Sequence, residues 1–191
     1  MTGFLYLFPV LQQAALRMSA LTLLKIILSI PIGIGLAYPF LRPDAPGGIL
    51  GELNIFGPVG SLVAIAVFLL LVLFYVLDLI NTLKLVSPAS RKARPNSVWF
   101  MFLLPYNFIE DFFIVSNVAK SLKAEAARNP ALATFKSFGM ISGLGWCTAQ
   151  VVSLIPNQIG SAAGLIAIGF WIWHWVFIRR ANGVLSKSNT S

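Results

Sequence analysis

The nineteen residues Val59–Leu77 contain no charged side chain, and this run constrains the fold more than any other part of the sequence. A helix needs about 17–25 mostly apolar residues to cross the roughly 30 Å of bilayer hydrocarbon. Three further apolar stretches have similar lengths: Ile26–Leu41, Phe138–Pro156 and Ile159–Ile178. In water all four would need burial on every side, which so short a chain can hardly achieve. The sequence therefore predicts an integral membrane protein.

The composition agrees with this class. Of the 191 residues, 58% are hydrophobic and 10% are charged, whereas a soluble domain has about 25% charged residues. The net charge of +8 is typical of membrane proteins that hold Lys and Arg at the cytoplasmic face, next to anionic lipid headgroups. We predict a single transmembrane domain over residues 1–191, with anionic headgroups as partners and no nucleic acid.

Basic residues in the gaps between apolar stretches predict the direction of each crossing, because short cytoplasmic loops are rich in Lys and Arg. The gap Lys84–Ser97 holds four basic residues and no acid, and the gap Lys120–Lys136 holds four basic residues and one acid. By contrast, Arg42–Pro58 has a net charge of −1 and Asn157–Gln158 is neutral. We therefore place both basic gaps and both termini in the cytoplasm of a bacterial-type inner membrane, with the other two gaps outside.

The segment between the two basic gaps, Val98–Ala119, would then begin and end on the same side of the membrane. It includes Pro105, followed by a pattern with a broad apolar face at helical spacing. The predicted fold is therefore an all-α integral membrane protein with an amphipathic helix, interfacial or re-entrant, between its second and third spans. The amphipathic helix is expected near 108–128, and the four transmembrane helices near 23–41, 59–83, 136–156 and 159–178.

A fifth span over Val98–Val118 is the competing interpretation of this segment. It would place Glu110 and Asp111 near the middle of the bilayer, at about 2.5–3.5 kcal/mol for a central Asp. In the interfacial interpretation Asn107 caps the helix and both acids complement its N-terminal dipole. We favour the interfacial or re-entrant helix, because the fifth span would also place a basic loop outside.

Three acids are candidate functional residues: Asp78, Glu110 and Asp111. Asp78 follows an uninterrupted apolar run, and intramembrane acids are often functional. The alternative for Asp78 is a structural ion pair with Lys84 or a loop Arg. Glu110 and Asp111 could bind a proton or a cation, but adjacent helical residues do not face each other.

His174 is the only histidine and lies among tryptophans in the sequence Trp-Ile-Trp-His-Trp. It could be the axial ligand of a haem or a chlorophyll-type pigment, but an interfacial aromatic belt explains the same residues. The single cysteine, Cys147, lies in an apolar run and lacks partners for a disulfide or a zinc site. We therefore predict no metal and no cofactor, with the pigment or haem as a weaker alternative.

Small residues four positions apart predict close helix packing in the last two spans. The pairs are Gly139 with Gly143 and Gly160 with Gly164. Because only two residues separate Pro156 from Ile159, these spans should form a tight antiparallel hairpin.

No catalytic motif such as HExxH, Walker A, GxSxG or CxxC occurs in the sequence, so we do not expect an enzyme. The small size and the many apolar aromatic residues favour an accessory, structural or assembly subunit that binds other integral membrane subunits. A small transporter or an oligomeric channel is the alternative, and a pigment- or haem-carrying subunit through His174 is a weaker one.

Overall fold

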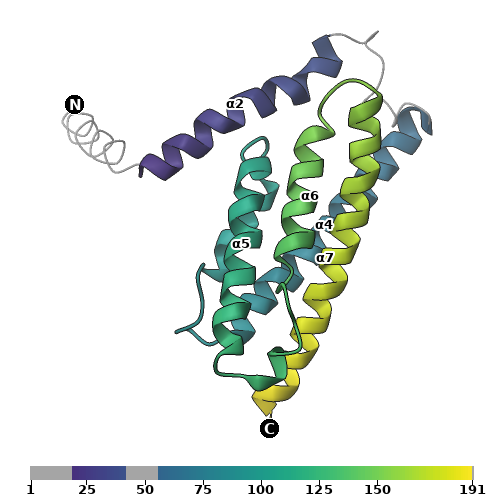
Figure 1. Cartoon of the computed structure of the whole chain (residues 1–191). Coiled ribbons are helices and arrows are strands. Elements are labelled where there is room, and N and C mark those ends of the chain that lie inside the picture. Colours follow the sequence, from purple (N-terminus) through teal and green to yellow (C-terminus); the bar gives the residue numbers. More distant parts are fainter. Residues whose placement is uncertain (1–18, 42–55, 191) are drawn as a thin grey trace, which may run out of the picture.

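The computed structural model describes residues 19–41 and 56–190, and within these ranges the regular structure is entirely helical (Figure 1). Most of the predicted external gap Arg42–Pro58 lies outside the described residues. The elements follow one another as α2 (Ala20–Leu41), α4 (Gly57–Leu85), the 3-10 helix η2 (Pro95–Phe102), α5 (Asn107–Ala126), the short 3-10 helix η3 (Pro130–Leu132), α6 (Met140–Val152) and α7 (Gln158–Thr190).

Three of the four predicted spans are confirmed as helices long and apolar enough to cross a membrane: α2, α4 and α7. The third predicted span, 136–156, is shorter than expected. Its helix α6 covers only 13 residues, about 20 Å at 1.5 Å per residue. Phe138 and Gly139 both adopt positive φ angles just before it, so the chain is irregular where the apolar pattern predicted a helix.

Helices α4 and α7 run parallel and are joined by polar side chains on successive turns. Tyr75 bonds His174, and about two turns further along Thr82 donates a hydrogen bond to Asn182 at 2.7 Å. Between them the indole of Trp175 donates to Asp78 at 2.7 Å. The charge pattern predicts that these two spans cross in the same direction, and a parallel arrangement is what that prediction requires.

The segment between α4 and η3 leaves one end of the bundle and returns to it. Ser87, just after α4, bonds Glu125 near the end of α5, and Asn129 bonds Ser188 near the end of α7. The far end of α5 lies instead beside α2, where Lys25 contacts Glu110. The chain thus runs through η2 toward α2 and returns through α5, so that both ends of this segment lie at the C-terminal end of the molecule (Figure 1).

Helix α5 forms close to its predicted position, but its apolar face is covered by protein rather than left for lipid. Ile114, Val115, Val118 and Leu122 are buried, and α5 packs along α6 and also contacts α4 and η2. The predicted cap is wrong, because Asn107 makes no capping bond and the helix begins after Tyr106. A side-chain cap at Asn107 therefore does not explain why Glu110 and Asp111 occupy the first turns of α5.

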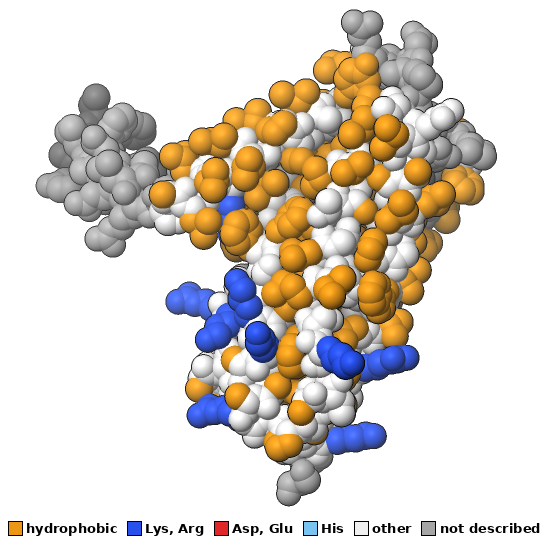
Figure 2. All heavy atoms as spheres, viewed as in Figure 1, with side chains coloured by type: hydrophobic (Ala, Val, Ile, Leu, Met, Phe, Trp, Pro, Cys, Tyr) orange, Lys and Arg blue, Asp and Glu red, His pale blue; other side chains and the backbone are white. Residues whose placement is uncertain are grey.

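Helices α6 and α7 form an antiparallel hairpin. The Asn157 side chain accepts hydrogen bonds from the backbone N–H groups of Ile159 and Gly160, which caps the start of α7. Lys and Arg side chains gather over the end of the bundle at which α7 finishes, whereas apolar side chains cover most of the rest of the visible face (Figure 2).

Candidate functional site

Four helices each place one buried polar residue in the centre of the bundle. We call this set the core polar cluster: Tyr75 of α4, Asp111 of α5, Cys147 of α6 and His174 of α7. Each of these residues is at most 2% exposed. Intramembrane polar residues that face a bundle interior mark functional sites more often than other positions do. The core polar cluster is therefore the candidate site.

A hydrogen bond of 2.7 Å joins the Tyr75 hydroxyl to His174 Nδ1. Tryptophan rings surround this pair, since Trp146, Trp171 and Trp175 all meet the Tyr75 ring edge-on at centroid distances of 5.5–6.0 Å. Because these indoles exclude water, the Tyr75–His174 bond forms in a low dielectric, where it is stronger than at a surface. His174 is thus a core residue and not part of an exposed belt.

Close packing against glycine fixes the other side of the imidazole. A Cβ atom at Gly143 would lie 3.0 Å from His174 Nε2 and would overlap Val115, and a Cβ at Gly139 would lie 3.1 Å from the same Nε2. Nothing larger than hydrogen therefore fits at Gly143. This packing weighs against a haem or chlorophyll-type macrocycle at Nε2, because such a ring would need the space that α6 fills.

The other predicted glycine pair lies at the start of α7. Gly160 approaches the backbone of Ile155 so closely that a Cβ atom would overlap its carbonyl oxygen, and Gly164 is buried. The close approach holds the turn between α6 and α7.

Asp111 is the unusual member of the core polar cluster. Its carboxyl is 2% exposed, and Oδ1 has no hydrogen-bond partner among the described residues. It lies near enough to Tyr75 and Cys147 for its charge to act on both. Burial without a partner disfavours the ionised form of a carboxyl, so this environment favours a protonated Asp111.

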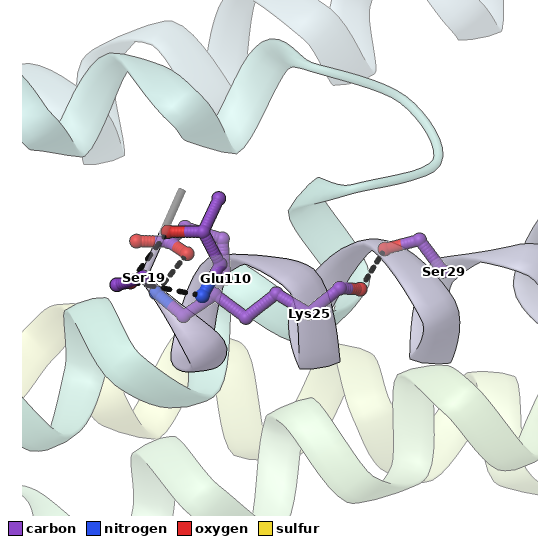
Figure 3. Close-up of polar contacts among 5 residues, drawn as sticks. Ser19, Lys25, Ser29 and Glu110 are labelled. Atoms are coloured by element: carbon purple, nitrogen blue, oxygen red, sulfur yellow. Dashed lines mark hydrogen bonds and ion pairs between the residues drawn. The ribbon is translucent and has the colours of Figure 1, made fainter. Parts of the chain in front are cut away.

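Glu110, the neighbour of Asp111, points toward α2 and pairs with Lys25 (Figure 3). The Nζ–Oε2 distance is 2.5 Å, and Nζ also lies 4.0 Å from the centroid of the Phe113 ring. Burial and the Glu110 carboxylate raise the pKa of Tyr106 to about 12. The sequence predicts that Glu110 complements the dipole of an interfacial helix, but in the structure α2 covers Glu110 and Lys25 supplies the compensating charge.

Asp78 lies at the α4–α7 contact and outside the core polar cluster. Besides the bond from Trp175, its Oδ2 is 3.8 Å from Arg179 Nε. The suggested Lys84 partner is not used, because six residues on a helix place the two side chains on different faces. The basic partner comes instead from α7.

The sequence identified Asp111 and His174 as candidates but missed Tyr75 and Lys25. Tyr75 is one of several aromatic residues in an apolar run of the sequence. Nothing in the local pattern reveals its partner 99 residues away. Lys25 gave a clearer signal, because a lone Lys at the start of an apolar stretch needs a partner if it is buried.

The described residues contain no group of three or more His, Cys, Asp or Glu side chains that could hold a metal ion. What the core polar cluster can do chemically is bind and exchange a proton through its carboxyl and imidazole groups. Comparisons with known protein families, with curated proteins and with solved structures found no match to this chain.

Proposed function

We propose that this protein is a non-catalytic accessory or assembly subunit of a larger integral membrane complex. The observation that supports this proposal is the attachment of α2. Only 11% of its apolar window is buried in the protein, against 22% for α4 and 33% for α7. A helix this poorly covered by its own chain offers a long apolar surface to other membrane helices.

The contact of α2 with the bundle is narrow. Its buried side chains Lys25, Ser29 and Ile32 form one stripe at helical spacing toward α5. Further along, Gly33 approaches Pro105 and Gly35 approaches Leu154. The rest of α2 presents Leu and Ile side chains that are 41–63% exposed, from Leu21 to Ile34. Such a surface suits packing against an apolar helix of a partner subunit.

Purification in mild detergent followed by sizing tests the proposal. We expect a complex with co-purifying membrane proteins, which weakens when Ile30 and Ile34 of α2 are both changed to Ala. Leu62→Ala with Val63→Ala on α4 is the matched control, because these side chains are 69% and 57% exposed on a different helix. A lone monomer in mild detergent would count against the proposal, and so would an equal effect of both pairs.

The proposed orientation places the C-terminal end of the bundle in the cytoplasm of a bacterial inner membrane, with its Lys and Arg side chains among anionic headgroups. The η2–α5 segment is then re-entrant, and α6 with residues 133–139 makes the fourth crossing. Native Cys147 would first be replaced by Ser. A cysteine at Ala131 should then react with an impermeant reagent only from the cytoplasm, and one at Gln158 only from outside. Labelling of Ala131→Cys from outside contradicts this topology.

A small transporter or oligomeric channel is the second candidate, favoured by the unpartnered buried atoms of the core polar cluster. Reconstituted vesicles test it directly through flux of protons or small cations. Absence of flux in the unmodified protein removes this candidate without affecting the first, since assembly is measured by sizing.

A further inference from the structure

Four exposed basic side chains lie where the loop after α4 passes α5, and we call them the basic patch: Lys92, Arg94, Lys120 and Lys123. The backbone N–H of Lys92 donates a hydrogen bond to Ser121 Oγ at 2.8 Å. This bond holds the loop against α5 at the residue that follows Lys120. Lys120 and Lys123 are three positions apart, so they share one face of that helix.

The charges of the basic patch are not used inside the protein. Its four side chains make no hydrogen bond or ion pair with the described residues, whereas Arg91 in the same loop bonds the carbonyl oxygens of Lys84 and Val86. The nearest acid in the sequence, Glu125, accepts hydrogen bonds from Ser87 instead. The basic patch therefore presents four positive charges to whatever lies outside the bundle.

Large apolar side chains are exposed directly after the basic patch, on η2. Trp99, Phe100 and Phe102 are 38–47% exposed, and Leu103 and Leu104 at the end of this segment are 53% and 63% exposed. The rings of Trp99 and Phe102 stack with their centroids 6.0 Å apart. Because η2 also packs against α5, the surface passes from basic to apolar as the chain runs from the loop toward α2.

A ligand that covers this whole surface needs a negative charge at one end and an apolar body next to it. A phosphate ion or an acidic peptide would meet the charges but would leave the η2 side chains uncovered. An anionic phospholipid has both parts. Basic residues beside membrane segments attract anionic headgroups, and tryptophan is enriched at the level of the headgroups.

We propose that the basic patch binds the phosphate headgroup of an anionic phospholipid, whose acyl chains cover the exposed side chains of η2. The inference rests on the proposed orientation of the bundle, in which the basic end meets the cytoplasmic leaflet. It goes beyond general contact with headgroups, because it assigns the selection of anionic lipid to one surface of that end.

Native mass spectrometry of the purified full-length protein tests the selection. The protein is equilibrated in mild detergent with equal amounts of phosphatidylglycerol and phosphatidylcholine, and the bound lipids are counted. We expect phosphatidylglycerol to be retained in preference, and Lys120→Gln with Lys123→Gln to lower this preference by about fivefold for each Lys. Lys120→Arg with Lys123→Arg keeps the charges and should keep the preference, which separates loss of charge from misfolding.

Lys136→Gln with Arg180→Gln is the matched control, because it removes two exposed charges on the α7 side of the basic end. Phe135, next to Lys136, contacts Phe177 of α7, and α6 lies between α7 and α5 (Figure 1). The proposal fails if the unmodified protein shows no preference or if both Gln pairs lower it equally. It also fails if inorganic phosphate, at matched ionic strength, displaces the bound phosphatidylglycerol completely, since the patch would then be a site for a free anion.

Trp99→Ala with Phe102→Ala tests the apolar half of the site. We expect fewer bound lipids of both kinds with an unchanged ratio between them, because acyl chains are common to both lipids. Unchanged retention would show that acyl chains do not cover η2. Lipid retention is measured on the isolated chain, so its failure is distinguishable from failure of the accessory-subunit proposal, which sizing measures.

Discussion

Helices α2 and α7 are both candidate membrane spans, yet they relate to the rest of the molecule in opposite ways. The burial of their windows differs threefold, at 11% and 33%. Helix α2 is the more apolar of the two and the less buried. Helix α7 carries His174, Trp175 and Asn182, and these polar side chains all bond to α4.

Hydropathy therefore indicates whether a helix can enter the membrane and not how closely it packs against other helices. Lipid covers Leu and Ile side chains as well as protein does, so an apolar helix can stay in the membrane without packing along its own chain. A polar side chain in the bilayer must find a protein partner instead. Helix α7 is therefore held along its length, whereas α2 is held mainly where Lys25 meets Glu110.

The largest effect is expected from removal of that single charge. Lys25→Met leaves Glu110 buried without its partner, which costs about 3–5 kcal/mol for a buried pair. We expect α2 to separate from α5 while α4–α7 stay folded. Loss of thiol cross-linking between cysteines at Gly33 and Pro105, positions in contact, measures the separation.

The double variant Lys25→Met with Glu110→Leu is the control for this prediction. Because it replaces the ion pair by apolar side chains, it should recover most of the cross-linking. If the single variant cross-links as well as the unmodified protein, the ion pair does not hold α2.

Gly143→Ala should disrupt the core of the bundle by a smaller amount. The added methyl overlaps Val115 and lies 3.0 Å from His174, and overpacking of this kind costs about 1–3 kcal/mol. Thermal unfolding in detergent, followed by circular dichroism, measures the loss. Gly169→Ala is the matched control, since its added methyl meets nothing within 4 Å. Equal stability of the two variants would show that α6 is not closely packed at this point.

The polar contacts along α4 and α7 should each contribute less. In a double-mutant cycle, Thr82→Ala with Asn182→Ala should show a coupling near the ~0.6 kcal/mol average for interhelical hydrogen bonds in membranes. Unfolding free energies of the four proteins give this value. A coupling of zero would mean that apolar contacts hold α7 against α4. Polar side chains would then not explain why α7 is more buried than α2.

The smallest effect concerns the loop after α4. Burial alone would raise the pKa of Glu125, but hydrogen bonds from Ser87 and Ser90 and the charge of Arg128 lower it below 4.5. A lowered pKa stabilises the folded form above the unfolded pKa, and this contribution disappears as pH falls through the folded pKa. Exchange of the Ser87 amide proton, corrected for intrinsic rates, should therefore accelerate in acid.

Glu125→Gln is the comparison for this measurement, because it removes the titrating group from the same position. In that variant the corrected exchange at Ser87 should not depend on pH. If exchange at Ser87 accelerates in acid as much in Glu125→Gln as in the unmodified protein, a group other than Glu125 causes the effect.

The membrane class, three helices long and apolar enough to span, and the position of α5 could all be predicted from the sequence. These follow from periodicity and length, because an uncharged run such as Val59–Leu77 has few alternatives to a membrane helix. The same pattern overestimated the helix at 136–156. Apolar composition does not reveal that Phe138 and Gly139 adopt positive φ angles, which delay the start of α6.

The pairing of the polar residues, by contrast, depends on the three-dimensional packing of the helices. Asp78 bonds Trp175 and lies near Arg179, and Glu110 bonds Lys25 across 85 positions of sequence. The sequence shows that each buried charge needs a partner, but in the low dielectric of a bundle any residue of the right chemistry can serve. Which one does so depends on the packing of helices far apart in the chain, and that packing is set by shape at positions such as Gly143.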